Sequence, residues 1–126
     1  MLIQSIYLGI NAVIYLILGI WCAIAPAKTS KSVGYDLVGN QGTAEFVAVY
    51  GGLEFALGIF FAIATFHPPF REPGLAFGGI LYAGLVTFRI FSMATNGAAI
   101  GGGWNFFGLE IVFLLGGIYC WFLAER

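Results

Sequence analysis

Apolar residues fill four long stretches of this chain, separated by short segments that contain proline, glycine or charged residues. The stretches cover residues 2–25, 43–67, 74–96 and 103–124. A helix needs about 20 apolar residues to cross the hydrocarbon core of a bilayer, and each stretch reaches that length. The runs are continuous, whereas strands of a membrane β-barrel alternate over about ten residues. We therefore predict an all-α integral membrane protein with four transmembrane helices.

Proline and glycine stand where the predicted helices should end. Pro26 follows the first stretch, Pro68 and Pro69 follow the second, and Gly97 follows the third. The connections of about 17, 6 and 6 residues are too short for another domain and favour antiparallel neighbours. We expect a single domain over residues 1–126, folded as one bundle of four antiparallel transmembrane helices.

Composition supports the membrane assignment and limits the classes of partner that the protein can bind. The chain is 60% hydrophobic and 9% charged, whereas a soluble domain carries about 25% charged residues. This excludes a lone soluble domain. The net charge of −1 leaves no basic stripe, so we expect no nucleic-acid partner. The expected partner is the lipid bilayer, with other membrane subunits or a second copy as further candidates.

The few cysteines and the single histidine predict neither a disulfide nor a metal site. Cys22 and Cys120 should lie at opposite ends of the bundle, and a disulfide needs Cα atoms within about 7 Å. With one histidine, His67, and no paired thiols, a metal site has little support, and no motif indicates a cofactor. Positive charge is balanced across the membrane, although the first helix favours a cytoplasmic position for Lys28 and Lys31.

Three ionisable residues, Glu54, Arg89 and Glu110, fall inside the predicted spans. Each costs about 2.5–3.5 kcal/mol on insertion scales, so such residues normally face the bundle interior and find partners. Arg89 and Glu110 should each lie roughly 10 Å from the membrane side that holds Lys28, and Glu54 roughly 16 Å. Their equal depth predicts that Arg89 contacts Glu110, with Glu54 within reach of both.

Helical spacing adds further polar side chains to these three. Tyr50 precedes Glu54 by one turn, and Tyr7, Asn11 and Tyr15 follow one another at intervals of four on the first helix. Tyr15 should lie about as deep as Glu54. The candidate binding or proton site therefore consists of Glu54, Arg89, Glu110, Tyr50, Tyr15 and Asn11. We assign no catalytic residue.

The charges of this candidate site do not balance. Arg89 stays charged, so two ionised carboxylates would leave a buried net charge of −1, and burial with like-charge repulsion favours one neutral carboxyl. We expect Glu54, the deeper acid, to hold the proton. Two interpretations stay open: the charged residues tie the helices together and fix their registry, or they bind a ligand or handle protons.

A short motif occurs twice and carries a family resemblance. Gly52-Leu53-Glu54 returns as Gly108-Leu109-Glu110 on a helix that should run the same way, which is compatible with a repeat of two hairpins. Tyr50–Gly58, Phe88–Ser92 and Gly108–Glu110 together resemble small four-helix bacterial membrane proteins classified as a domain of unknown function, distantly similar to DoxX-like proteins. The resemblance implies a multi-pass protein of the bacterial inner membrane and no assigned reaction.

Three functions compete at this stage. The first is a non-enzymatic subunit or accessory protein, favoured by small size, the absence of a catalytic motif and abundant small residues for helix contact. The second is a binder or proton-coupled carrier of a small lipophilic solute that uses Glu54, Arg89 and Glu110. The third is an intramembrane isomerase in which a glutamate acts as acid or base.

Overall fold

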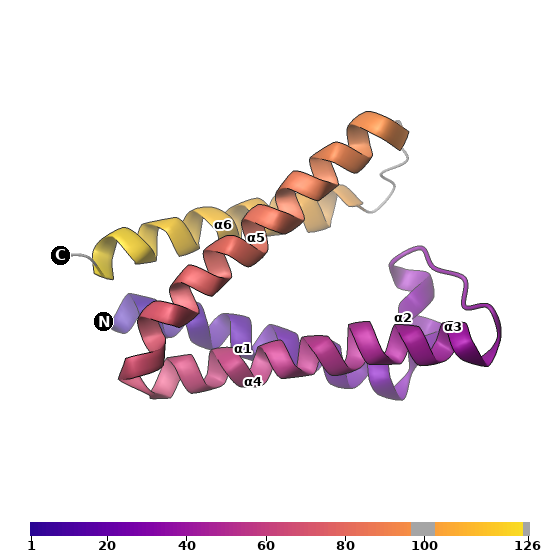
Figure 1. Ribbon diagram of the computed structural model, residues 1–126, viewed down its shortest axis with the longest axis horizontal. Coiled ribbons are helices and arrows are strands. Elements are labelled where there is room, and N and C mark those ends of the chain that lie inside the picture. Colours follow the sequence, from indigo (N-terminus) through magenta and orange to yellow (C-terminus); the bar gives the residue numbers. More distant parts are fainter. Residues whose placement is uncertain (97–102, 125–126) are drawn as a thin grey trace.

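The computed structural model describes residues 1–96 and 103–124, which are almost entirely helical. Within these two ranges there is no β-strand. In chain order the helical elements, labelled in Figure 1, are α1 (Leu2–Ile24), α2 (Pro26–Ser32), α3 (Gly39–Phe46), η1 (Val47–Leu53), α4 (Glu54–Phe66), α5 (Pro68–Asn96) and α6 (Gly103–Ala124). Here η1 is a π-helical segment, and α3, η1 and α4 follow one another without interruption.

In the described part of the chain, four helical runs are long and apolar enough to cross a membrane. They are Leu2–Ile24, Gly39–Phe66, Pro68–Asn96 and Trp104–Ala124. The prediction of an all-α protein with four membrane-length helices is therefore confirmed. The first and last helices also have the predicted limits to within one residue.

Two predicted boundaries differ from those observed. The second long helical run begins at Gly39 rather than Thr43. The third begins at Pro68 rather than Gly74, because the first backbone N–H groups of a helix have no intrahelical acceptor and proline loses nothing there. His67, between α4 and α5, is extended (φ −105°, ψ 107°), as expected before a proline. Gly97, the predicted stop of the third helix, lies outside the described residues.

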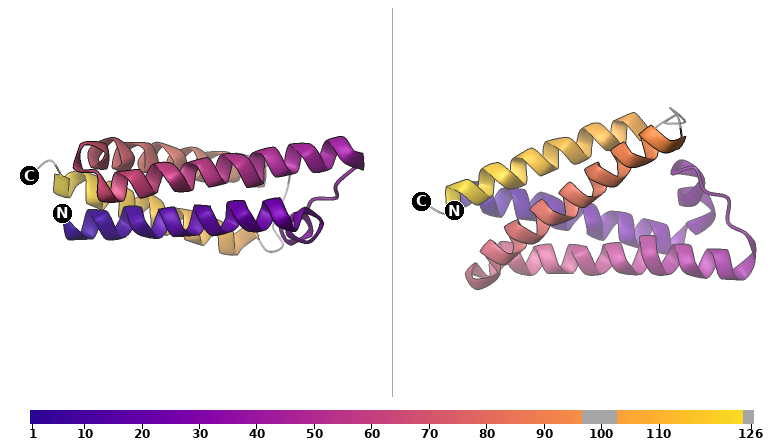
Figure 2. Two further views of the ribbon diagram at one scale, coloured as in Figure 1. Left: turned by 90° about the horizontal axis from the view of Figure 1, so that it is seen from below. Right: turned by 45° about the horizontal axis from the view of Figure 1, so that its top comes forward.

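The four long runs form two hairpins. Successive runs point in opposite directions, so α1 lies along η1 and α4, and α5 lies along α6 (Figure 1). The two hairpins meet where α1 begins and α6 ends, and they separate toward the end that carries α2 and α3 (Figures 1 and 2). The helices are splayed apart at one end instead of forming the uniform bundle that the sequence predicted (Figure 1).

Glycines permit the close packing of the first hairpin. A Cβ atom at Gly19 would lie 2.6 Å from the backbone nitrogen of Phe55 and 2.8 Å from the carbonyl oxygen of Gly51. A Cβ atom at Gly58 would lie 2.7 Å from the backbone nitrogen of Leu16. The backbones of α1 and the η1–α4 run thus approach too closely for any side chain at these positions, as in other membrane helix pairs with small interface residues.

The hydrophobic core lies at the end where the hairpins meet. It combines residues of all four long runs: Tyr7, Leu8, Ala12, Tyr15, Phe61, Ala64, Leu75, Tyr82 and Cys120. Two hydrogen bonds join α1 to α6 across it, since the Tyr7 hydroxyl donates to the Phe113 carbonyl (2.9 Å) and the Gln4 amide donates to the Cys120 carbonyl (3.3 Å). Most of the contact between the hairpins is therefore confined to one half of their length.

Candidate functional site

An ion pair between Arg89 on α5 and Glu110 on α6 is the centre of the candidate site. Nε of Arg89 lies 2.7 Å from one carboxylate oxygen of Glu110, and Nη2 lies 2.6 Å from the other. This parallel two-bond geometry is the strongest form of an arginine–carboxylate contact. Each residue stands seven positions from the described limit of its helix, Asn96 or Gly103. The contact predicted from equal depth is confirmed.

Glu54 belongs to the other hairpin and is not part of this ion pair. It is the first residue of α4, and it is half-buried. Its carboxyl makes no hydrogen bond or ion pair with any described residue. It lies within electrostatic range of Tyr15 and Cys22 on α1. The three ionisable residues thus divide into a closed pair and an acid whose hydrogen-bonding capacity is unused.

Tyrosines connect the two parts of the site. Tyr50 is within electrostatic range of both Glu54 and Arg89, and Tyr15 is within range of both Glu54 and Glu110. We call the set Tyr15, Tyr50, Glu54, Arg89 and Glu110 the polar cluster. The structure therefore brings together five of the six candidate residues, drawn from all four long runs.

The π-helical segment η1 carries Tyr50 and ends immediately before Glu54. Such segments are rare, cost regular hydrogen bonding, and occur frequently at functional sites. Tyr50 donates a hydrogen bond to the hydroxyl of Tyr35 (3.0 Å) and stacks on Phe46 (4.7 Å between ring centroids). The connection after α2 therefore folds back onto η1 through Tyr35.

Asn11, the sixth candidate, lies in the core beside the polar cluster and has its own partners. It is fully buried, accepts a hydrogen bond from the Tyr82 hydroxyl and donates one to the Tyr7 carbonyl (2.8 Å). Both ends of its amide are therefore engaged within the protein. Asn11 links α1 to α5 and has no amide group directed at a ligand.

Sequence analysis left two of these side chains out of the candidate site. Tyr82 shares a helical face with Arg89 at a spacing of seven, so its contact with α1 could have been inferred from periodicity. Tyr35 lies in a connection whose apolar character indicates a packed segment rather than a solvated loop. No local signal in Val47–Leu53 indicates a π-helix; the segment packs against α1 in the structure.

The polar cluster is accessible from outside the protein. The side chain of Arg89 is 32% exposed, and that of Glu110 is 11% exposed. Arg89 and Glu110 belong to the last third of α5 and the first half of α6, and these parts of the two helices lie where the two hairpins separate (Figure 2). The side chains of Arg89 and Glu54 are therefore partly exposed rather than enclosed in the core.

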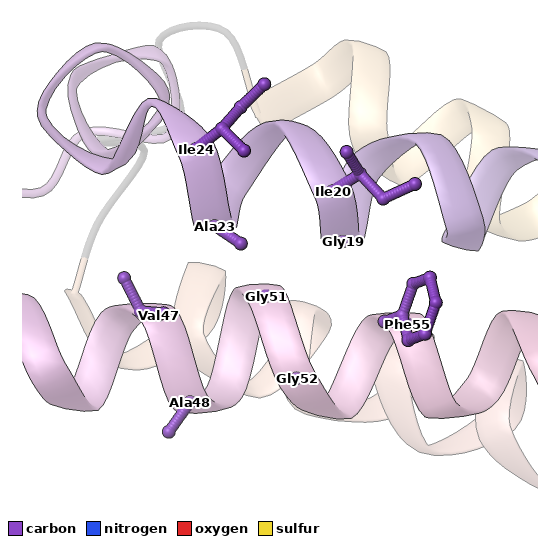
Figure 3. Close-up of a pocket in the computed structure, with 9 residues that line it drawn as sticks. All are labelled: Gly19, Ile20, Ala23, Ile24, Val47, Ala48, Gly51, Gly52 and Phe55. Atoms are coloured by element: carbon purple, nitrogen blue, oxygen red, sulfur yellow. The ribbon is translucent and has the colours of Figure 1, made fainter.

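An apolar groove of about 500 Å³ follows the outer edge of the α1–η1 contact (Figure 3). It is a poor candidate for specific recognition, since ligand sites combine apolar walls with a few polar groups that orient the ligand. Its walls are formed by Gly19, Ile20, Ala23, Ile24, Val47, Ala48, Gly51, Gly52 and Phe55.

One protein family, described as a domain of unknown function (DUF4345), matches residues 3–123. No curated protein and no solved structure matches the chain. The predicted resemblance to a family of unknown function is confirmed, whereas the distant similarity to DoxX-like proteins stays a prediction. The matched range contains the whole polar cluster together with Asn11.

Proposed function

The chain belongs to the family of the domain of unknown function DUF4345, and we propose that it is a non-enzymatic membrane protein that binds a small lipophilic molecule at the polar cluster. Its location would be the inner membrane of a bacterium. The observation that carries the proposal is Glu54: a carboxyl group well inside a membrane-length helix that no described residue engages. Polar groups at this depth are costly and normally find partners. A bound ligand would supply that partner.

The geometry of the ion pair argues against a purely structural role for the cluster. Arg89 and Glu110 lie on α5 and α6, which already form one hairpin. Their contact therefore adds nothing to the joint between the hairpins, which depends on Tyr7, Gln4 and the core. A tie that fixes the registry of all four helices would engage Glu54 as well.

A membrane accessory subunit is the second candidate, and the exposure of α5 and α6 favours it. In the most apolar window of each run, 39% of residues are buried in Leu2–Ile24, 22% in both Gly39–Phe66 and Pro68–Asn96, and 17% in Trp104–Ala124. The two runs of the second hairpin, like Gly39–Phe66, thus offer most of their surface to lipid or to another membrane protein. No feature of the described residues adds support to the third function, an intramembrane isomerase.

Native mass spectrometry of the protein purified in mild detergent tests the binding function. We expect the wild type to carry a co-purified lipophilic molecule, and Glu54→Ala to reduce its occupancy at least tenfold. Glu45→Ala is the matched control, because Glu45 is an exposed acid on the same continuous helical run, outside the polar cluster. It should retain the wild-type occupancy.

The comparison has clear negative results. Absence of any bound molecule in the wild type, or equal occupancy in Glu54→Ala, would contradict binding at this cluster. Circular dichroism and gel filtration of each variant separate loss of ligand from loss of fold.

Crosslinking of the wild type in membranes tests the subunit function: a partner captured through α5 or α6 supports it, whereas contacts to lipid alone contradict it.

A further inference from the structure

The connection between α2 and α3 has a glycine in the left-handed region at each end. Gly34 has φ +83° and Gly39 has φ +63°, and no other described residue has a positive φ. A Cβ atom added at either glycine would meet no atom within 4 Å. Glycine crosses between left-handed and right-handed backbone conformations at little cost, so two glycines in open space can act as hinges. We call residues 34–39 the strap.

Few contacts hold the strap in place between these glycines. The backbone N–H groups of residues 36–38 donate hydrogen bonds to no described residue. No residue of the strap belongs to the hydrophobic core, and only Leu37 is half-buried while the rest are exposed. Its first turn is tied to α2, since the N–H of Tyr35 donates to the Ser30 carbonyl (2.8 Å). A segment with few buried contacts and exposed backbone groups opens more readily than the helices around it.

The side chain of Tyr35 joins the strap to the second membrane-length run. Its hydroxyl accepts a hydrogen bond from the hydroxyl of Tyr50 (3.0 Å). Its ring lies edge-on to the rings of Tyr50 and Phe46, with centroids 5.6 Å and 6.3 Å away. Edge-to-face pairs at these distances attract each other. Because Tyr35 is itself exposed, these contacts can break and form again without disturbing the core.

The partner of Tyr35 is a member of the polar cluster. Tyr50 lies on the π-helical segment η1, stacks on Phe46 (4.7 Å) and is within electrostatic range of Glu54 on its own hairpin and of Arg89 on the other. The connection that holds Tyr35 lies at the end of the molecule where the two hairpins separate (Figure 1). The contact between Tyr35 and Tyr50 therefore links a weakly held segment to the cluster.

We propose that residues 34–39 are a hinged strap, which Tyr35 latches onto Tyr50, and that opening of the strap releases Tyr50 within the polar cluster. In the closed state, which the structure shows, the Tyr50 hydroxyl donates to Tyr35. In the open state the strap has turned about Gly34 and Gly39, and the Tyr50 hydroxyl is free to donate to another acceptor. The inference goes beyond the proposed binding function and does not depend on it, because the contacts that define the latch all lie within the chain.

Hydrogen–deuterium exchange of the full chain in nanodiscs tests the latch, with the peptide that covers residues 33–42 as the readout. We expect Tyr35→Ala, which removes the ring and the hydroxyl, to speed exchange in this peptide at least tenfold. Tyr35→Phe removes only the hydroxyl and should speed it at least twofold. Tyr119→Ala is the matched control, because Tyr119 is an exposed tyrosine on α6 without a hydrogen bond or ring contact to a described residue. Unchanged exchange in peptides of α5 and α6 shows that each variant keeps its fold.

Fluorine NMR of the chain labelled with 3-fluorotyrosine tests whether the hinges control Tyr50. The Tyr50 resonance is assigned by Tyr50→Phe, and its position in Tyr35→Ala marks the open state. Gly39→Ala disfavours the left-handed backbone of the closed strap, so we expect it to move the Tyr50 resonance from the wild-type position toward the open one. Gly84→Ala is the control, since its Cβ would also meet no atom within 4 Å but its φ is not positive.

Two results would overturn the proposal. If Tyr35→Ala and Tyr35→Phe both exchange at the wild-type rate over residues 33–42, Tyr35 is not a latch. If Gly39→Ala leaves the Tyr50 resonance at its wild-type position, or moves it no further than Gly84→Ala does, the strap does not control Tyr50. Neither measurement involves a ligand, so failure of the strap leaves the proposed binding function standing, and failure of that function leaves the strap standing.

Discussion

At the scale of single residues, the polar cluster combines one saturated ion pair with one unused acid. Arg89 and Glu110 satisfy each other through two short hydrogen bonds, and the pair is accessible mainly through Arg89. Glu54 belongs to the other hairpin, and Tyr15 and Tyr50 are each within electrostatic range of Glu54 and of one member of the pair. The glutamates of the two Gly-Leu-Glu motifs therefore have different roles. Glu110 is the counter-charge of Arg89, whereas the carboxyl of Glu54 makes no hydrogen bond to a described residue.

Replacing Glu110 by glutamine should destabilise the protein because Arg89 loses its counter-charge inside the membrane. We expect Glu110→Gln to lower the free energy of unfolding by about 3 kcal/mol, the lower end for a broken buried pair, since a third of Arg89 is exposed. Unfolding in mixed detergent micelles measures the change. Glu45→Gln, at an exposed acid without an ion pair, should change stability by less than about 0.5 kcal/mol. If Glu110→Gln and Glu45→Gln change the free energy of unfolding equally, the Arg89–Glu110 pair does not stabilise the fold as proposed.

Glu54 is expected to be a neutral carboxylic acid at pH 7, because the one arginine of the polar cluster is already paired with Glu110. Infrared difference spectra of the wild type and Glu54→Gln should then show a protonated carboxyl band that belongs to Glu54 across neutral pH. Glu54→Gln should leave fold and assembly unchanged, since the amide mimics the neutral acid. A Glu54 that is already ionised at pH 5 would end the neutral-acid hypothesis.

At the scale of elements, glycine positions decide how closely the helices of the first hairpin approach. Gly19 faces the backbone of Gly51 and Phe55, so the π-helical segment with Tyr50 and the start of α4 is positioned by direct contact with α1. Any displacement of this contact moves Tyr50 and Glu54 together relative to Arg89. The packing of the hairpin and the geometry of the polar cluster are therefore linked.

Gly19→Ala should destabilise the protein by about 1–3 kcal/mol, the range for overpacking, because backbone atoms cannot move aside as a flexible side chain can. Gly9→Ala on the same helix is the matched control. Its new Cβ would lie 3.7 Å from Thr65 Cγ2, an ordinary contact, and alanine favours a helix over glycine by about 0.5–1 kcal/mol. The free energies of unfolding of Gly19→Ala and Gly9→Ala show whether the backbones approach closely at Gly19. A Gly19→Ala protein as stable as the Gly9→Ala protein would refute the close approach.

At the scale of the whole molecule, two antiparallel hairpins share a core at one end and separate at the other (Figure 1). The cysteines illustrate the arrangement. The backbone carbonyl of Cys120 accepts a hydrogen bond from the side chain of Gln4, near the start of α1. Cys22 lies near the end of α1, and both thiols are free. The prediction that the two cysteines are unbridged and lie at opposite ends is therefore confirmed.

The alternating direction of the four runs predicts the membrane topology. Single cysteines introduced at Lys31 and Asn105 should react with an impermeant maleimide from one side of the membrane, and a cysteine at His67 from the other. All three residues are exposed, while the two native thiols are buried, so the unsubstituted protein supplies the background. We expect the side of Lys31 to be cytoplasmic. Labelling of His67→Cys and Lys31→Cys from the same side would refute four crossings.

The sequence by itself determined the class of the protein, the number of its long helices and the partner of Arg89. Each of these follows from a local requirement: a crossing needs about 20 apolar residues, and charges on successive helices must lie at matching depth to pair. The tertiary structure alone decided that the two hairpins separate at one end, that Val47–Leu53 is π-helical and that Glu54 has no hydrogen-bond or ion-pair partner among the described residues. These features depend on how helices rotate and approach one another, through contacts such as Gly19 against Phe55. Hydropathy does not encode that approach, because lipid-facing and helix-facing positions are equally apolar in a membrane.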